Sequence, residues 1–420
     1  MTARFRIRPE SAGFTVFLGA LAAFGPIAID LAQPAIAPIA RSLNAAPNTI
    51  TLTLSFFMAG AMAGPLLFGP LSDRIGRKPV VMIGCLVYAL ASLGCAVSTS
   101  AGVFLGLRLL QGAAAGAGNV ASIAMVRDLF KGDLARARLS YVSLVSTLAP
   151  MAAPALGVWI LAAGGWRSTF ASMTVLGLGL LLAATLLLGE SLPRSMRTER
   201  RGASVLAGFG RPLKNPVFVG YALTQGLSFG ALIAFIAISP LMLIENLGAS
   251  RPLYALLFAC IVVMSMAGGF LNGRLASRGV AAGKVLAVAL CVGPAASLGL
   301  LVLALTGMAS LWTFVPLLMA SFMMGSMIGP NATHGALEHS QGQAGVSAAV
   351  FGFLQTACGT VVAAIASLVF DPTTAAPIAA VMAASALGSA AVYFAWVRPR
   401  ERAARRELAG ALSPIPGAGL

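Results

Sequence analysis

The strongest constraint on the fold is a series of twelve apolar segments, each long enough to cross a membrane. Their approximate bounds are 14–38, 49–71, 80–98, 102–126, 137–163, 166–189, 215–243, 252–276, 282–307, 310–334, 344–370 and 373–397. A helix of about 20 apolar residues crosses a hydrocarbon core of about 30 Å. The chain of 420 residues is only 10% charged, whereas soluble domains carry about 25% charged residues. We therefore predict an all-α polytopic membrane protein with twelve transmembrane helices.

The basic residues lie between the apolar segments in a strongly one-sided pattern. If the N-terminus is cytoplasmic, only Arg41, Arg167 and Arg251 fall on the outer side, Arg108 falls within a span, and every other Lys and Arg lies inside. Because cytoplasmic loops carry an excess of Lys and Arg, we predict that both termini are cytoplasmic. A basic inner surface that faces anionic lipid explains the net charge of +16. We therefore expect the lipid bilayer, and not nucleic acid, as the partner of these charges.

A polar, Arg-rich stretch from Glu190 to Lys214 divides the chain into two groups of six apolar segments. We predict an N-terminal six-helix bundle over residues 1–190, a cytoplasmic linker over 191–214, a C-terminal six-helix bundle over 215–397 and a cytoplasmic tail over 398–420. A weak internal repeat supports a duplication, because Gly268–Leu275 occupies the place in the second half that Gly69–Gly76 occupies in the first. Parallel repeats of this kind suit a transporter with a central site between its halves.

The short connection between the second and third segments reads Gly69-Pro70-Leu71-Ser72-Asp73-Arg74-Ile75-Gly76-Arg77-Lys78-Pro79. It resembles the Gly-x-Leu-x-Asp-Arg-x-Gly-Arg-Lys signature that the major facilitator superfamily carries at this place. The resemblance implies the major facilitator fold of two pseudo-symmetric six-helix bundles. It also implies an inner-side conformational latch, in which Asp73 contacts the start of span 11, formed by Gly69, Asp73, Arg74, Gly76 and Arg77. A loop that only orients the helices is the alternative interpretation, but topology requires neither Asp73 nor Gly76.

Two ionisable residues of the first half lie inside apolar segments, where a charge costs roughly 2.5–3.5 kcal/mol at the centre of a span. At ~1.5 Å per residue, Asp30 lies about 12 Å and Arg108 about 9 Å from the outer ends of their spans. We expect these side chains to pair or to respond to one another. A low-dielectric cavity favours the neutral carboxyl and a nearby arginine favours the charged form, so such a site can load and release a proton. The alternative is a static ion pair that only holds spans 1 and 4 together.

The residues around Arg108 and in the fifth segment extend the resemblance. Arg108-Leu109-Leu110-Gln111-Gly112 is similar to the Arg-x-x-Gln-Gly motif of the superfamily's fourth span, whose arginine is implicated in proton coupling. The fifth segment contains Pro150, Pro154 and Gly157, which we expect to kink the helix or to admit close packing. This run is similar to the Gly/Pro-rich motif that the superfamily's substrate–proton exchangers carry. Glycines that are frequent in that motif are replaced by Ser146, Ala153 and Val158.

Further positions resemble the bicyclomycin- and chloramphenicol-resistance branch of the superfamily. They are the Ala-Pro-x-x-x-Pro form of the fifth segment, Asp30 with a following proline, Arg127-Asp128 after the fourth span and Glu190-Ser191-Leu192-Pro193 after the sixth. Where that branch commonly has Asp-x-Tyr-x-Pro, this chain has Asp30-Leu31-Ala32-Gln33-Pro34. Because the aromatic residue is missing, the substrate range of the branch does not transfer directly to this chain.

Polar residues within the apolar segments are the candidates for a substrate cavity, namely Asp30, Gln111, Asn119, Gln225, Asn331 and Gln355. An interhelical hydrogen bond is the alternative role of Asn119. We expect Asn331 and Gln355 to lie nearer the cavity or its cytoplasmic mouth than Asn272, which is near the end of a span. The five cysteines lie inside apolar segments without metal-ligand spacing, so we interpret them as small buried side chains. We expect no metal and no cofactor, with the proton gradient as the energy source.

The leading hypothesis is a proton-coupled exporter of small, largely apolar drugs or metabolites across the bacterial inner membrane. Such an antiporter works by alternating access, and one chain of this fold suffices for transport. The first alternative is an uptake symporter for a small metabolite, against which the fifth-segment motif and the few cationic residues in the second half argue. A receptor or a lipid-acting enzyme is the second alternative. No nucleophile–base pair, metal set or phosphate loop is recognisable in the sequence, so we expect no enzyme.

Overall fold

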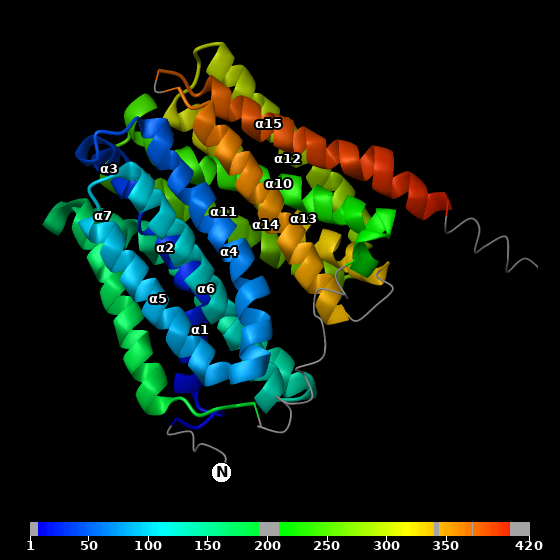
Figure 1. Ribbon diagram of the computed structural model, residues 1–420. Coiled ribbons are helices and arrows are strands. Elements are labelled where there is room, and N and C mark those ends of the chain that lie inside the picture. Colours follow the sequence, from blue (N-terminus) through cyan, green and yellow to red (C-terminus); the bar gives the residue numbers. More distant parts are fainter. Residues whose placement is uncertain (1–6, 193–209, 340–343, 372, 404–420) are drawn as a thin grey trace, which may run out of the picture.

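The computed structural model describes residues 7–192, 210–339, 344–371 and 373–403 (Figure 1). Over these ranges the chain is almost wholly helical and contains no strand. The first half consists of α1 (Ala12–Ala22), α2 (Phe24–Asp30), η1 (Gln33–Ala35), α3 (Ile36–Ser42), α4 (Pro47–Ile75), α5 (Arg77–Val97), α6 (Ala101–Leu129) and α7 (Gly132–Leu187). The second half consists of α10 (Pro216–Pro240), η3 (Leu241–Asn246), α11 (Arg251–Ser277), α12 (Ala282–Leu305), α13 (Leu311–Glu338), α14 (Ala344–Leu368), α15 (Ala376–Ala391) and η4 (Val392–Val397).

The first span is present but broken. Between α1 and the segment from Phe24 to Ser42 the chain bends by 51°, and α2 then ends at Asp30 before the single turn η1. Pro34 lies in η1 and lacks the backbone N–H that a continuous helix requires. The local sequence therefore favours an interruption directly after Asp30.

The fifth and sixth spans both belong to α7, which reverses its direction at Gly165 (φ 74°, ψ −177°). Near its start, Arg138 donates to Thr15 Oγ1 at 2.7 Å, and at its end the Leu187 carbonyl oxygen accepts from the N–H of Ile7. Both ends of α7 therefore lie beside the start of the chain. Ten described helices are long and apolar enough to cross a membrane, and the bent first span adds an eleventh. Because α7 crosses twice, all twelve predicted spans have a helical counterpart.

The two halves meet at the upper end of Figure 1, which we predict to face outward and call the outer end, and they diverge toward the opposite end, which we call the inner end. One continuous hydrophobic core joins residues of the first half, such as Ile36, to residues of the second half, such as Phe235. A separate core around Phe218 contains residues of the second half alone. Along α4, most residues from 50 to 60 are buried, and most from 61 to 71 are at least partly exposed. The two halves are therefore packed together at the predicted outer end and separated at the predicted inner end.

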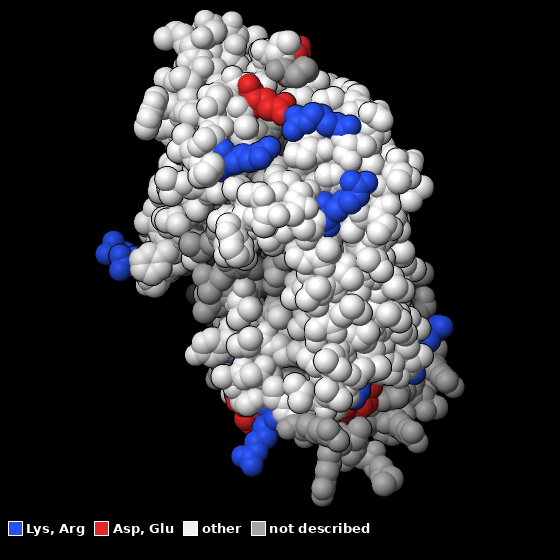
Figure 2. All heavy atoms as spheres, turned by 90° about the vertical axis from the view of Figure 1, so that its left-hand side faces the viewer, with Lys and Arg blue, Asp and Glu red and all other residues white. Residues whose placement is uncertain are grey.

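Charged side chains gather at the two ends of the face that Figure 2 shows, and the broad surface between them is almost free of charge. This distribution is the one expected for a protein whose middle faces lipid. Most of the predicted linker and tail, including Arg194, Arg197, Arg200, Arg201, Arg405 and Arg406, lies outside the described residues. The predicted domain boundaries and the cytoplasmic placement of both termini therefore stay predictions.

Candidate transport site

Asp30 lies at the break of the first span and is buried, with 5% of its surface exposed. The break is packed against the fifth span, because a Cβ added to Gly157 would lie 2.6 Å from the carbonyl oxygen of Leu31. Only glycine permits so close an approach of the two backbones. Pro154, earlier in the same span, is buried, and the side chain of Pro150 lies outside the described set.

Arg108 occupies the interior of the N-terminal bundle and is 1% exposed. Its Nε donates to Thr53 Oγ1 at 3.0 Å, and its Nη1 donates to the Ala28 carbonyl oxygen at 3.2 Å and to Gln111 Oε1 at 2.5 Å. The guanidinium also lies over the ring of Phe57, 4.6 Å from its centroid. Neutral acceptors from α2, α4 and α6 therefore hold this buried cation in place, which reduces the cost of its desolvation.

Asp30 and Arg108 form no ion pair in this conformation, since no described ion pair joins them. The static pair that the sequence left open is therefore wrong for this state, because other acceptors occupy the guanidinium. Arg108 instead contacts the first span two residues before Asp30, through Ala28. Just after Asp30, η1 contacts α10 of the second half. The carboxyl group thus lies where the first half meets the second.

The other polar candidates of the first half occupy two different environments. Gln111 is fully buried and donates to Ser92 Oγ at 2.6 Å, so in this state it lies inside the bundle and does not line an open cavity. Asn119 is exposed on α6, and no hydrogen bond of its side chain to another described residue is found. The cavity role of these two residues stays a prediction.

The three polar candidates of the second half differ in burial and in hydrogen-bond partners. Gln225 is 8% exposed, and its Oε1 has no hydrogen-bond partner among the described residues. Asn331 is 9% exposed and donates to Asn272 Oδ1 at 2.6 Å, so the two amides form one partly buried link between α13 and α11. Gln355 is partly exposed on α14. The expectation that Asn331 and Gln355 lie nearer the cavity than Asn272 stays a prediction.

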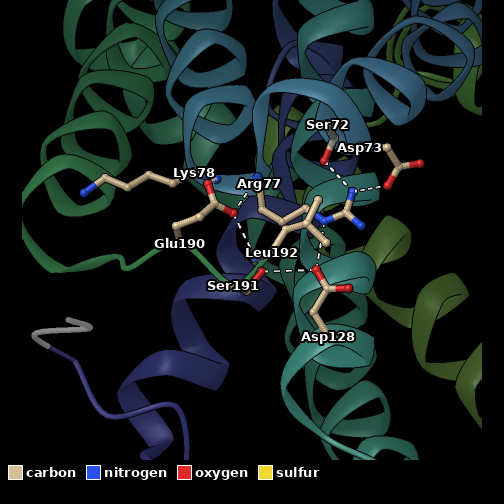
Figure 3. A network of polar contacts seen from close by, with 8 residues as sticks. All are labelled: Ser72, Asp73, Arg77, Lys78, Asp128, Glu190, Ser191 and Leu192. Atoms are coloured by element: carbon tan, nitrogen blue, oxygen red, sulfur yellow. Dashed lines mark hydrogen bonds and ion pairs between the residues drawn. The ribbon is translucent and has the colours of Figure 1, made fainter. Parts of the chain in front are cut away.

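The signature between the second and third spans builds a buried network around Arg77 (Figure 3). Arg77 is 4% exposed. Its Nη1 lies 2.8 Å from both Asp73 Oδ1 and Ser72 Oγ, and its Nε lies 2.8 Å from Asp128 Oδ2. Gly76, with φ 108°, makes the turn that brings Arg77 beside Asp73, a backbone conformation that favours glycine. Among the described inner-end residues, Arg74 is exposed and Gly69 partly exposed.

Glu190 joins the end of the sixth span to this network. Its two carboxylate oxygens accept from the backbone N–H groups of Arg77 at 2.9 Å and Lys78 at 3.3 Å, at the start of α5 (Figure 3). A carboxylate at this place satisfies free N–H groups and complements the positive end of the helix dipole. Ser191 donates to Asp128 at 3.2 Å. The sequence offered Asp128 and Glu190 only as points of resemblance, because residues so distant in the chain give no local sign of contact.

The inner end of the second half has a different polar cluster, which sequence reasoning missed. The Tyr221 hydroxyl donates to Glu401 Oε1 at 2.6 Å, and His339 Nε2 lies 3.8 Å from the same oxygen. Asn215 donates to the carbonyl oxygen of His339 at 2.7 Å. The cluster connects the start of α10, the end of α13 and the helical residues that follow η4. Only its spacing in three dimensions identifies it, since its members are scattered over most of the second half.

Comparisons with known proteins agree with this architecture. The family model described as Major Facilitator Superfamily matches residues 16–367. The bicyclomycin resistance protein homolog of Haemophilus influenzae is 30% identical over 388 residues, covering 91% of this chain and 95% of that protein. A chloramphenicol resistance protein of Pseudomonas aeruginosa is 34% identical over 273 residues, or 64% of each chain. A partially occluded inward-open structure of the Escherichia coli xylose transporter XylE has a TM-score of 0.70 at 14% identity, covering 91% of this chain and 96% of that one.

Proposed function

Because the chain belongs to the Major Facilitator Superfamily and is a multi-pass membrane transporter, we propose that it exports small, largely apolar compounds in exchange for protons. The relatives named for bicyclomycin and chloramphenicol resistance support this direction of transport. We place the protein in the bacterial inner membrane with both termini in the cytoplasm. The likeness to the xylose transporter is a likeness of fold and carries no argument about substrate or direction.

The observation that carries the proposal is the state of Asp30. It is buried at a helix break, beside the contact between the halves, and has no ion-pair partner among the described residues. Arg108, the nearest candidate partner, is already satisfied by neutral acceptors. A proton can therefore bind to or leave Asp30 without breaking a buried ion pair. Protonation removes a charge from a low-dielectric site, which favours tighter burial of the break and biases movement of the two halves.

The inner-end network supplies the second part of the proposal. We assign it the latch role, in which Asp73 and Arg77 stabilise the state that is closed at the inner end. In the present state Arg77 bridges Asp73 and Asp128, both of the first half. Closure of the inner end brings the start of α14 toward this surface, where the positive end of the helix dipole favours Asp73.

The proposal is tested with everted membrane vesicles and chloramphenicol as the probe. We expect the parent to accumulate the drug when a proton gradient is imposed, and to release protons into the medium from the vesicle lumen as it does so. Asp30→Asn keeps the size of the side chain but cannot ionise, so drug accumulation against a gradient should fall to the level of empty vesicles. Asp73→Asn is the matched control, since it should slow drug and proton movement together without separating them.

Two results would overturn the proposal. Accumulation by Asp30→Asn equal to that of the parent would remove Asp30 from proton coupling. In intact cells of an efflux-deficient bacterium, a higher content of labelled compound with the protein than without it would reverse the direction and favour a symporter. A susceptibility panel that includes bicyclomycin and chloramphenicol identifies which compounds deserve the vesicle assay.

A further inference from the structure

A small cavity lies inside the C-terminal bundle, between α10, α12, α13 and α15. Its polar side chains are the serines Ser228, Ser297, Ser321 and Ser389, and we call it the serine cavity. The remaining lining residues are apolar or glycine, and none is charged. The space holds roughly three water-sized groups, so it fits a branch of a drug-sized molecule and not the whole molecule.

The serine cavity opens between α10 and α13. Its lining residues on α12 and α15 are all buried, whereas Ser228 and Leu232 of α10 and Ser321 and Gly325 of α13 are partly exposed. A Cβ added to Gly325 would meet no atom within 4 Å. The helix α10 also contacts α4 and η1 of the first half, so one helix of the mouth takes part in the contact between the two halves.

The mouth of the serine cavity has unused hydrogen-bonding capacity. Within the described chain, the Ser228 hydroxyl has no hydrogen-bond partner, and Ser321 has only a long contact of 3.4 Å with Ser297. Gln225 lies one turn before Ser228 on the same face of α10 and is packed against Gly329 of α13. Its Oε1 is buried without a partner among the described residues, but Gln225 does not line the serine cavity, so the free capacity at the mouth is that of Ser228 and Ser321.

We propose that the serine cavity binds an uncharged, hydroxyl-bearing branch of the transported compound. The hydroxyl accepts from Ser228, which lines the cavity, while the apolar walls exclude charged groups, whose burial without a partner is too costly. This inference rests on the proposed export function and names one part of the substrate class. It places that part inside one bundle, beside the space between the halves.

Thiamphenicol and florfenicol are suitable probes because they differ in one group, a primary hydroxyl that fluorine replaces in florfenicol. Their dissociation constants are measured on the purified full chain by competition with labelled chloramphenicol. Ser228→Ala should weaken thiamphenicol binding about five-fold, the size of one net hydrogen bond, and leave florfenicol binding unchanged. Gly325→Val fills the serine cavity and should weaken both probes more strongly. Gly106→Val, on α6, is the matched control, since Gly106 also has no atom within 4 Å of an added Cβ.

The outcomes separate this inference from the export function. If the parent exports the probes and both cavity variants bind them as the Gly106→Val control does, the serine cavity is not a binding site, and export stands. If Ser228→Ala weakens both probes equally, the hydroxyl assignment is wrong. If the parent neither binds nor exports any compound of the panel, the export function fails and this inference fails with it. Should Gly325→Val not fold, Ser228→Ala alone decides, because it removes a single oxygen atom.

Discussion

The interiors of the two halves contain different kinds of side chain, although both halves have the same helical architecture. In the first half, Arg108 and Gln111 of α6 reach acceptors on α2, α4 and α5 and fill the centre of the bundle. In the second half, α13 holds the place of α6, and the buried polar side chains of the described residues are all uncharged. There the centre contains the serine cavity. The helices of the first half are therefore held together by a buried cation, whereas the interior of the second half contains a cavity.

This difference suggests a division of tasks between the halves. A guanidinium held by several directional bonds fixes the helices around Asp30, where a proton site needs defined geometry. Small residues and hydroxyls impose fewer directional demands, so the second half is better suited to compounds of varied shape. We interpret the first half as the proton side and the second half as the adaptable substrate side.

Gly112→Ala in α6 is expected to cause the largest loss of stability. A Cβ at this position would lie 1.9 Å from the carbonyl oxygen of Phe57 in α4, so the two helices must separate. We expect a loss of more than about 3 kcal/mol in the free energy of unfolding, measured by thermal unfolding of the purified protein. Gly325→Ala in α13 should leave stability unchanged or raise it, because the added methyl group meets no atom and alanine favours a helix.

The controls for Gly112→Ala are on the same helix. Gly106→Ala adds the same methyl group to α6 in open space, so it separates steric overlap from the change in helix propensity. Equal unfolding temperatures for Gly112→Ala and Gly106→Ala would show that α4 and α6 do not pack as closely as the structure places them. Equal losses for Gly112→Ala and Gly325→Ala would remove the contrast between the two interiors.

The number of spans, the signature turn and the presence of Asp30 and Arg108 inside membrane spans could be predicted from the sequence, because hydropathy and isolated intramembrane charges are local features. The partners of Arg108 were not, since a guanidinium chooses among acceptors that only the tertiary fold brings together. The contact of Glu190 with the start of α5 spans more than a hundred residues and leaves no periodic pattern. The serine cavity is an absence of side chains, and no spacing of small residues distinguishes an empty interior from a tightly packed one.

Arg108→Gln is expected to cause the second-largest loss of stability. The shorter side chain can satisfy only part of what the guanidinium bonds, namely Thr53 Oγ1, the Ala28 carbonyl oxygen and Gln111 Oε1. Leaving buried acceptors unpaired costs about 1–3 kcal/mol each, so we expect the unfolding free energy to fall by about 2–3 kcal/mol. Ser321→Ala, the matched change in the second half, should cost less than about 0.5 kcal/mol. A loss for Ser321→Ala as large as that for Arg108→Gln would contradict the comparison.

The smallest change in stability is expected for the hydrogen bond between the side chains of Asn331 and Asn272 in the second half. Asn331 donates to Asn272 Oδ1 at 2.6 Å and to the Met327 carbonyl oxygen at 2.7 Å, so Asn331→Ala removes both bonds. Side-chain hydrogen bonds between membrane helices contribute about 0.6 kcal/mol on average. A double-mutant cycle of Asn331→Ala and Asn272→Ala should therefore give a coupling free energy of about 0.6 kcal/mol. A coupling above about 2 kcal/mol would mean that the second half is pinned by a polar link as firmly as Arg108 pins the first, and the two interiors would differ in charge but not in rigidity.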